Sequence, residues 1–318
     1  MKRKLVVADL SNIEGRLLAY LAGEEWKLQA FRDFDAGQGP DLYNVTAVGI
    51  VGGDPWTVLK HIRNVFGKVV DLASGYQGGN GAFETFEKTF GVDLLDYWPL
   101  IQSTAAPEIL DRAYYNWEKW GHQRNPNVPH DLWAARETCK LTWRARHPAT
   151  VALWYAVTDA AKSALLNPGV TYQAGPHLTV CYSSHAPGEW LLIRLPSGKY
   201  LTYFNPVAIE EGAFRCEGMV QTSTGGRVWG DNYMYGGKII ENACQALAGD
   251  VLKYNMPSIE QAGYDLLFTV HDEDIASAPD RPEYNAAHLS SLMARVPPWT
   301  PGLPLAAAGF ESYRYRKD

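Results

Sequence analysis

The sequence has no long hydrophobic run and no paired cysteine motif. None of its apolar stretches approaches the roughly 20 residues that a membrane-spanning helix needs. Its basic start, residues 1–4, precedes an apolar run too short for a signal peptide. The cysteines lie far apart without a CxxC pair, which argues against a zinc knuckle and favours reduced thiols of a cytosolic protein. These cysteines are Cys139, Cys181, Cys216 and Cys244.

A basic excess is also missing. The formal net charge is −6, from 29 Lys and Arg against 35 Asp and Glu. Proteins that bind nucleic acid usually carry the opposite balance, so the charge argues weakly against that class, although a local basic groove can coexist with an acidic remainder. What the chain does have is 318 residues and 46% hydrophobic content, enough for one large globular domain or two lobes.

Two apolar segments end in carboxylates. Residues 264–270 lead into His271-Asp272-Glu273, and a shorter apolar run near the N-terminus leads into Asp9. Adjacent carboxylates at the tip of a buried strand repel each other and resist desolvation. A divalent cation relieves that repulsion. We therefore predict that Asp9 joins the Asp-Glu pair in a site for two hard metal ions that handle phosphates.

A capped helix is predicted directly after Asp9. The segment from Ser11 to Glu14 has the S-x-x-E form of a capping box, in which the Glu reaches back to the N-cap amide. Apolar residues then recur at helical spacing up to Leu21. The predicted order is strand, metal-type aspartate, helix.

The following part of the chain is predicted to be helical. We expect helices over about 41–52 and from Pro55 to the Gly-rich segment 75–81, whose glycines end the second helix. Residues 131–166 have a helical pattern rich in Trp, which indicates core and interface. The tail from Pro297 is rich in Pro and Ala, and we expect it to wind over the surface.

Between about 169 and 233 the pattern changes to that of strands. Apolar segments at 191–195 and 200–204 flank Pro-Ser-Gly-Lys, which predicts a hairpin. A long helix is then expected over 237–254, and a shorter one through 259–261 before the strand that enters the His-Asp-Glu segment.

A second group of functional candidates lies on the helix expected from Pro55. Arg63 and Lys68 are five residues apart, so on an ideal α-helix they are offset by roughly 140°, and Tyr76 projects from a neighbouring face. Such a helix offers two cations to a triphosphate and an aromatic ring to a base. Taken alone, an Arg and a Lys on a helix are usually just solvated.

Together these segments resemble the polymerase core of family A DNA polymerases, the bacterial DNA polymerase I type, in their phage-encoded form. Five motifs of that family occur in order: D-x-S-x-I-E-x-R, a helix with Arg, Lys and Tyr, L-P-S-G-[RK], Y-G-G-K-x-x-E-N-x-x-Q-A, and H-D-E. They occupy residues 9–16, 63–76, 195–199, 235–246 and 271–273. Each motif is modest alone, and their order carries the resemblance.

The resemblance implies template-directed transfer of nucleotides from dNTPs to a primer 3′-hydroxyl. Asp9 and Asp272 would bind two Mg²⁺ ions, for which Mn²⁺ is a substitute, with the Leu10 backbone carbonyl as a further ligand. Glu273 would support the site, and Lys68 would protonate the leaving pyrophosphate.

Other motif residues would contact nucleotide and DNA. Arg63 and Lys68 would hold the triphosphate, Leu72 stands at the sugar position, and Tyr76 would stack near the templating position. Glu14 would help to reject a ribose 2′-hydroxyl. The implied nucleotide-binding residues are Arg63, Lys68, Leu72, Tyr76, Glu14 and Leu10, and the implied DNA contacts are Arg16 (primer backbone), Gln245 and His271 (minor groove and primer end).

Three positions depart from the family pattern. Arg63 lies five residues before Lys68 instead of four, which indicates a distorted helix or another role for the Arg. Leu72 stands where Phe or Tyr is typical, and Gly249 replaces a cation.

The resemblance also implies the architecture. We predict an α/β (α+β) fold with an antiparallel palm sheet and a mostly helical fingers lobe, lacking thumb and exonuclease domains. Palm segments 1–35 and 235–318 flank fingers 36–234, with a β-rich insert around 169–233. Because the first motif begins at residue 9, we expect the C-terminal subunit of a split polymerase. A partner chain would supply the thumb and 3′-5′ exonuclease.

Primer-template DNA and dNTPs are the other expected partners, and no membrane is expected. A role in phage DNA replication would place the chain in the cytoplasm of an infected bacterial host.

Two other classes remain open. A metal-dependent nuclease or phosphohydrolase would use the same carboxylates but does not need the helix with Arg63, Lys68 and Tyr76. A catalytically silent structural subunit would keep the polymerase fold, although drift would then have little reason to spare buried charges such as Asp9 and Asp272. Nucleotide incorporation measured against DNA degradation separates the two enzymes.

Overall fold

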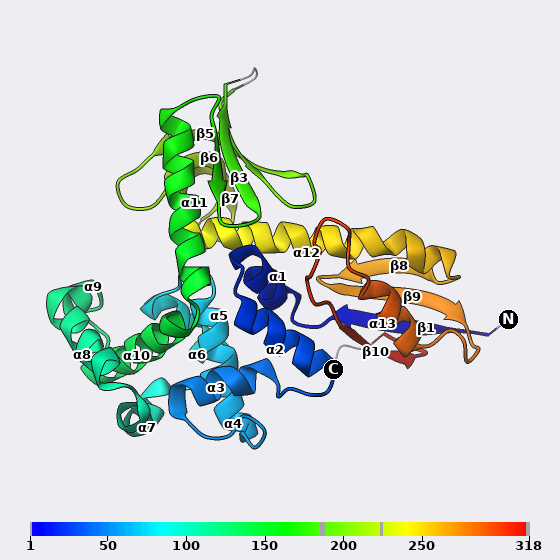
Figure 1. Cartoon of the computed structure of the whole chain (residues 1–318), viewed down its shortest axis with the longest axis horizontal. Coiled ribbons are helices and arrows are strands. Elements are labelled where there is room, and N and C mark those ends of the chain that lie inside the picture. The colour runs from blue at the N-terminus through cyan, green and yellow to red at the C-terminus, as the bar shows by residue number, and fades with distance from the viewer. Residues whose placement is uncertain (1, 185–187, 223–224, 316–318) are drawn as a thin grey trace.

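The computed structural model describes residues 2–184, 188–222 and 225–315. A four-stranded antiparallel sheet, in the order β10-β1-β9-β8, lies at one end of the molecule (Figure 1). Its strands come from both ends of the chain: β1 (Arg3–Leu10), β8 (Asp265–Val270), β9 (Glu273–Pro279) and β10 (Ala307–Ser312). The first and last segments of the sequence therefore build one sheet, which we call the palm sheet.

Strand β8 lies at an edge of the palm sheet and is largely exposed. Leu267 and Phe268 keep 52% and 50% of their surface exposed. The expectation of a buried strand before His271 was therefore wrong. The apolar sequence suits a strand, but β1 and β9 occupy the centre of the sheet, and their residues are the buried ones.

The C-terminal tail also differs from the expectation, because it ends in a strand of the palm sheet. Strand β10 pairs with β1 from Leu5↔Ser312 to Leu10↔Ala307. Gly309 allows this close approach, since a Cβ at that position would overlap the carbonyl oxygen of Val7.

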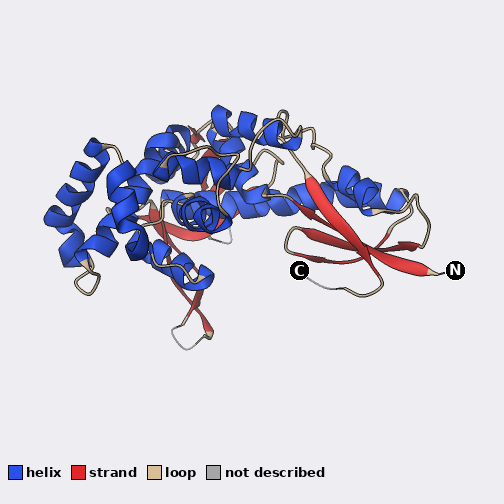
Figure 2. Cartoon of the chain, turned by 90° about the horizontal axis from the view of Figure 1, so that it is seen from below, coloured by secondary structure: helices blue, strands red, loops and turns tan. Residues whose placement is uncertain are grey.

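Helices α12 (Gly236–Gln261) and α13 (Ala286–Met293) pack along one face of the palm sheet (Figure 2). Helix α12 is continuous through Pro257, where two helices were predicted. An internal proline removes one backbone hydrogen bond and costs about 3 kcal/mol. Tertiary contacts offset this cost. For example, Asn255 Nδ2 donates to the carbonyl oxygens of Met293 and Arg295, at 2.8 and 3.0 Å.

After β1 the chain forms α1 (Ile13–Ala22) and α2 (Glu25–Asp35) and then enters a helical lobe. Helix α3 (Leu42–Val51) begins after Asp41, which accepts hydrogen bonds from two amides of the first turn, as predicted for 41–52. The next helix begins at Lys60 and not at Pro55. The other elements of the lobe are α4 (Lys60–Ile62), η1 (Arg63–Val69), α5 (Val70–Ser74), α6 (Asn80–Phe90), η2 (Leu94–Tyr97), α7 (Trp98–Thr104), α8 (Pro107–Asn116), η3 (Trp117–Gly121), α9 (His122–Arg124), α10 (His130–Arg146) and α11 (Pro148–Leu166).

A buried polar network fastens α2 to the helical lobe. Asp71 accepts hydrogen bonds from Lys27 Nζ and Trp143 Nε1, each at 2.8 Å. The His147 ring stacks on Trp143 with centroids 3.8 Å apart, and its Nε2 lies 3.4 Å from Lys27 Nζ. Burial, with the Lys27 charge, lowers the pKa of His147 to about 3. The fully buried members of the predicted Trp-rich core are Trp133, Trp143 and Trp154.

A six-stranded antiparallel sheet, the insert, stands between α11 and α12, as the strand-like pattern predicted. Its β4–β5 turn rests on α12, where Asp250 accepts a hydrogen bond from Ser197 at 2.6 Å and pairs with Lys199. The motif at 195–199 thus contacts α12 just beyond the motif at 235–246. The strands are β2 (Thr171–Ala174), β3 (Leu178–Ser183), β4 (Trp190–Arg194), β5 (Tyr200–Ala208), β6 (Phe214–Gln221) and β7 (Arg227–Met234).

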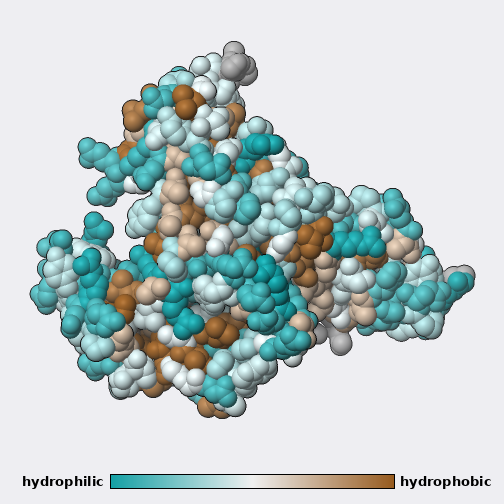
Figure 3. All heavy atoms as spheres, in the orientation of Figure 1, coloured by the Kyte–Doolittle hydropathy of each residue, from teal (hydrophilic) through white to brown (hydrophobic). Residues whose placement is uncertain are grey.

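The surface is mostly hydrophilic on the face seen in Figure 3, with hydrophobic patches between the polar residues. Among the described residues, no helix combines the length and the apolar character needed to cross a membrane. All four cysteines are free thiols, as expected from their spacing.

Candidate active site

The acidic residues predicted from opposite ends of the sequence meet at one end of the palm sheet. Asp9 on β1 lies directly opposite Glu273 on β9 in the antiparallel register. Directly opposed side chains in such a pair have Cβ atoms about 4.5–5.5 Å apart. The amide of Leu10 donates to the carbonyl oxygen of Asp272 at 3.1 Å, which ties the end of β1 to the turn. The central sequence prediction about these acids is therefore consistent with the fold.

A two-residue turn, His271-Asp272, places one acid at the tip of the β8–β9 hairpin. Val270 pairs with Glu273 on either side of it. His271 has φ 56°, the left-handed conformation that such turns require and that Gly or Asn adopts more easily. Strain of this kind is characteristic of functional turns. Glu273 is buried and accepts a hydrogen bond from the Tyr315 hydroxyl at 3.2 Å.

Asp274 is a third consecutive carboxylate that the sequence reasoning missed. Its side chain is fully buried, and neither oxygen has a hydrogen-bond partner among the described residues. Burial raises its pKa to about 6. The residue stands opposite Ala8 in β1, one position beyond the Asp9–Glu273 pair. When ionised, Asp274 therefore adds a further negative charge next to the predicted metal ligands.

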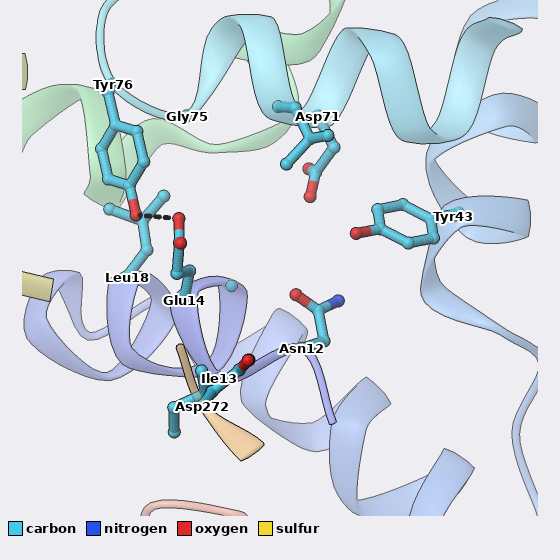
Figure 4. A pocket seen from close by; sticks show the side chains of 11 residues that line it. Asn12, Ile13, Glu14, Leu18, Tyr43, Asp71, Gly75, Tyr76 and Asp272 are labelled. Carbon is cyan, nitrogen blue, oxygen red and sulfur yellow. Dashed lines mark hydrogen bonds between the residues drawn. The ribbon is translucent and has the colours of Figure 1, made fainter. Parts of the chain in front are cut away.

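Asp272 borders two hollows that share Ile13 and Glu14 of α1. The first, of about 640 Å³, extends between α1 and the helical lobe toward Leu72 and Tyr76 (Figure 4). The second extends along α12. Its lining residues are Ile13, Glu14, Gln245, Ala248, Gly249, His271 and Asp272. Several predicted nucleotide and DNA contacts therefore surround the same carboxylate.

Glu14 connects the two hollows. Its Oε2 accepts a hydrogen bond from the Tyr76 hydroxyl at 3.2 Å, and its Oε1 accepts one from Gln245 Nε2 at 2.6 Å. Burial raises the pKa of Tyr76, so the hydroxyl stays protonated and donates. Three residues predicted from separate motifs are thus joined directly.

The predicted capping box is absent. Helix α1 begins after Asn12, which has left-handed φ 49° and makes no side-chain cap. Ser11 instead donates its amide to the carbonyl oxygen of Ala306. The prediction failed because Glu14 is engaged by Tyr76 and Gln245 and does not turn back to the helix end.

Two further residues of the first hollow were not anticipated. Tyr43 of α3 and Asp71 of α5 line the end of the hollow away from Tyr76 (Figure 4). Burial, reinforced by the nearby Asp71 charge, raises the pKa of Tyr43 to about 12. Only the tertiary fold brings these two residues beside α1, so no local pattern signals them.

The helix of the helical lobe that carries Arg63 and Lys68 is distorted between these residues. Residues Arg63–Val69 form a π-helix, whose wider turn bonds residue i to i+5. Positions five apart are therefore brought closer to one helix face, which accounts for the unusual spacing. Arg63 makes a bidentate pair with Asp41, with both N···O distances 3.0 Å, and Lys68 Nζ lies 4.7 Å from the Phe90 ring centroid.

Arg16 does not have the exposure expected of a DNA contact. It is 1% exposed, and Asp35 binds its guanidinium through two bonds of 2.6 and 2.7 Å. Its Nε also donates to the Ser11 carbonyl oxygen at 2.7 Å. This Arg closes the junction between β1, α1 and α2, and the predicted contact to the primer backbone is not retained.

Within the described ranges, no group of three or more His, Cys, Asp or Glu side chains is arranged to hold a metal ion. The predicted ligand set is smaller, with two carboxylates (Asp9 and Asp272) and the Leu10 carbonyl. These are hard oxygen donors of the kind that Mg²⁺ prefers. The donor chemistry fits a divalent cation, and its binding stays a prediction.

An acidic pair thus lies at the ends of two central strands and is faced by a helical lobe. The fold is similar to a solved POL domain of Pol1 from M. smegmatis in complex with DNA primer-template and dNTP, with a TM-score of 0.50 and 16% identity. That likeness covers 98% of this chain and 39% of the other chain. The predicted mixed helix and sheet fold is confirmed.

In sequence, the chain is 31% identical over 321 residues to the DNA polymerase of Bacillus phage SP02. The match covers 98% of this chain but only 41% of the relative's length. No family model matches the chain. The resemblance to DNA polymerases that the motifs indicated is confirmed.

Proposed function

We propose that this chain is the palm and fingers part of a DNA-directed DNA polymerase that transfers nucleotides from dNTPs to a primer 3′-hydroxyl. One observation carries the proposal: Asp9 and Asp272, 263 positions apart in the sequence, meet at the end of the palm sheet beside a hollow that reaches the fingers helix. The sequence relative is itself a DNA polymerase, which supports the same reaction class.

Asp9, Asp272 and the Leu10 carbonyl would hold the divalent cations, with Mg²⁺ as the expected ion. When bound, the cations supply charge neutralisation at the phosphates and a lowered pKa of the attacking hydroxyl. Glu273 is buried between β1 and β8 and is held by Tyr315, so its part is to fix the acidic end of the sheet.

The fingers helix would position the incoming nucleotide. Leu72 and Tyr76 line the hollow beside Asp272, which supports roles near the sugar and base. Lys68 would act on the phosphates. Arg63 can reach the phosphates only if its ion pair with Asp41 opens, because its Nε and Nη2 both donate to the Asp41 carboxylate.

The second hollow would receive the primer-template end. Gln245 and His271 line it together with Asp272, so both side chains border the reacting centre. This supports the predicted contacts of Gln245 and His271 with DNA.

Primer extension with single carboxylate variants tests the function. Asp272→Asn and Asp9→Asn keep the side-chain size and should each lower extension by at least about a hundredfold, because several kcal/mol of charge stabilisation are lost. Glu311→Gln, on the neighbouring strand β10, is the matched control and should extend normally. Persistent extension by Asp272→Asn would remove that residue from the site, and degradation without extension would identify a nuclease.

We also propose that a further protein segment covers the palm edge, either a partner chain with thumb and exonuclease or another part of a longer polymerase. The support is the exposed pair Leu267 and Phe268 on the edge strand β8, because exposed apolar strand edges are normally protected. Co-purification with the tagged chain from its native host tests this. Leu267→Lys should release a partner that binds there, and unchanged recovery would contradict the proposal.

A further inference from the structure

The insert sheet carries an aromatic hollow that is separate from the acidic site. It is open to solvent, spans about 1260 Å³ with that solvent included, and is lined by rings from three strands. The centroids of Trp190 and Phe204 lie 4.9 Å apart, and those of Phe204 and Trp229 lie 6.3 Å apart. The lining residues are Trp190, Thr202, Tyr203, Phe204, Cys216, Glu217, Trp229, Asn232, Met234, Lys238 and Asn242.

Trp229 is exposed and yet held in place. Its side chain keeps 60% exposure, while its Nε1 donates to Glu217 at 3.0 Å. The same carboxylate accepts a hydrogen bond from Asn205 Nδ2, also at 3.0 Å. The Glu217 carboxylate therefore accepts hydrogen bonds from two neutral donors. An oriented indole with an open face is suited to stacking on a flat ring.

Helix α12 contributes polar groups to this hollow. The Lys238 ammonium makes no hydrogen bond or ion pair with any described residue, although its charge partly offsets the burial that raises the pKa of Glu241. Asn242 donates to the Tyr203 hydroxyl at 3.0 Å, and its amide oxygen remains as an acceptor. The hollow thus combines stacking rings, an uncommitted cation and an amide.

The same helix joins the aromatic hollow to the candidate active site. Lys238 and Asn242 line the former, and Gln245 and Gly249 line the hollow that contains Asp272. These four positions follow i, i+4, i+7 and i+11 and so share one face of the helix. From Lys238 to Gln245 the rise is about 10 Å, roughly the length of three stacked nucleotides.

We propose that the aromatic hollow binds unpaired bases of the template strand, about three or more nucleotides from the reacting position. The proposal rests on the proposed polymerase function, because continuity with the hollow at Asp272 selects a nucleic-acid strand as the occupant. Aromatic rings supply sequence-tolerant stacking, and Lys238 faces the phosphates. A protein segment would have no reason to follow the stripe on α12 to the acidic site.

Binding of labelled primer-templates with template overhangs of 2, 4 and 8 nucleotides tests this. The unaltered chain should bind the 8-nucleotide overhang about tenfold more tightly than the 2-nucleotide one, because stacking of single bases is worth this much or more. Trp229→Ala should lose this tenfold gain in affinity for the long overhang while it binds the 2-nucleotide overhang with unchanged affinity. Trp229→Phe, which keeps an aromatic face, should retain most of it. Trp56→Ala removes an equally exposed Trp of the helical lobe, 61% exposed, and should change nothing.

Primer extension on the 2-nucleotide overhang, measured in parallel, separates this proposal from the polymerase function. If extension proceeds but affinity is independent of overhang length, the template-binding proposal is wrong and the polymerase function stands. If Trp229→Ala still binds the 8-nucleotide overhang more tightly than the 2-nucleotide one, to the same degree as the unaltered chain, the template-binding proposal is also wrong. If extension fails, single-stranded dT16 still tests the hollow, and equal binding of dT16 by the unaltered chain and Trp229→Ala would overturn the assignment.

Discussion

The Tyr76 hydroxyl donates a hydrogen bond to Glu14 at 3.2 Å, and this bond joins the segment after α5 to α1. Glu14 also holds Gln245 of α12. One carboxylate therefore links three parts of the chain at the border of the candidate active site. Its removal should affect selectivity more than folding, because α1 itself is anchored by buried apolar residues.

Glu14→Ala should weaken discrimination against ribonucleotides. Truncation enlarges the hollow beside Asp272 and releases Tyr76, so space opens where a 2′-hydroxyl would lie. We expect the ratio of kcat/KM for dNTP over rNTP to fall by about tenfold, a loss of roughly 1.4 kcal/mol in selectivity. Glu14→Gln keeps the size and an acceptor oxygen and should retain most discrimination. An unchanged ratio in Glu14→Ala would contradict the assigned role.

Lys68→Ala should cost more catalysis than Arg63→Ala. The guanidinium of Arg63 is committed to Asp41 through two bonds, whereas Lys68 lies over the Phe90 ring without a carboxylate partner among the described residues. We expect a loss in kcat/KM of about a hundredfold for Lys68→Ala and a smaller one for Arg63→Ala. Lys60→Ala, at the start of the same helix, is the control. Single-turnover kinetics would measure both losses, and a larger loss for Arg63→Ala than for Lys68→Ala would refute this prediction.

Gly237→Ala should destabilise the protein, while Gly249→Ala on the same helix should not. A Cβ at residue 237 would overlap the carbonyl oxygen of Tyr76, but one at residue 249 meets nothing within 4 Å. Forced overpacking typically costs about 1–3 kcal/mol, and replacing an unrestrained helical Gly by Ala gains about 0.5–1 kcal/mol. Chemical denaturation measures both. Equal stability of the two variants would show that α12 does not press on Tyr76.

The contribution of His147 to stability should fall as the pH is lowered from about 6.5 toward 3, and buried Asp274, whose raised pKa is about 6, opposes this change below pH 6. The pKa of His147 is depressed to about 3 in the folded protein, while an unfolded His has a pKa near 6.5. Between these values only the unfolded state binds the proton, so the free energy of unfolding drops by up to about 1.4 kcal/mol per pH unit. The depressed pKa of Asp71 acts in the same direction at lower pH, where the unfolded carboxyl is protonated first.

His147→Gln should flatten this pH dependence, and His61→Gln, an exposed His on α4, should leave it as it is. Urea titrations at pH 7, 6, 5 and 4 provide the measurement. If both variants follow the unaltered protein, the buried network around Asp71 is not the source of the acid sensitivity.

The meeting of Asp9 with Asp272 could be predicted because it depends on strong, repeated signals. Each lies at the end of an apolar strand, and the motif order supplied the pairing. The helix at 42–51 was equally accessible, since Asp41 is a good N-cap residue. Local chemistry decided these features, and the tertiary structure left them unchanged.

Other features depend on contacts that no local pattern contains. The tail strand β10 has little alternation, and its place is set by a glycine that fits against Val7. Pro257 normally interrupts a helix, but α12 is held by its neighbours on both sides of that residue. The π-helix at Arg63 is a third case, because one extra residue is absorbed by the backbone where a regular α-helix would have rotated the two cations apart.

Because β1 lies between β10 and β9, and both of these strands come from the C-terminal part of the chain, the acidic centre cannot be assembled during early synthesis. A ribosome must deliver residue 312 before the strand that carries Asp9 gains both of its neighbours. The helical lobe and the insert are translated before β8, β9 and β10, and they can fold around their local contacts first. A nascent chain therefore lacks its acidic cluster until β9 has been synthesised and has paired with β1.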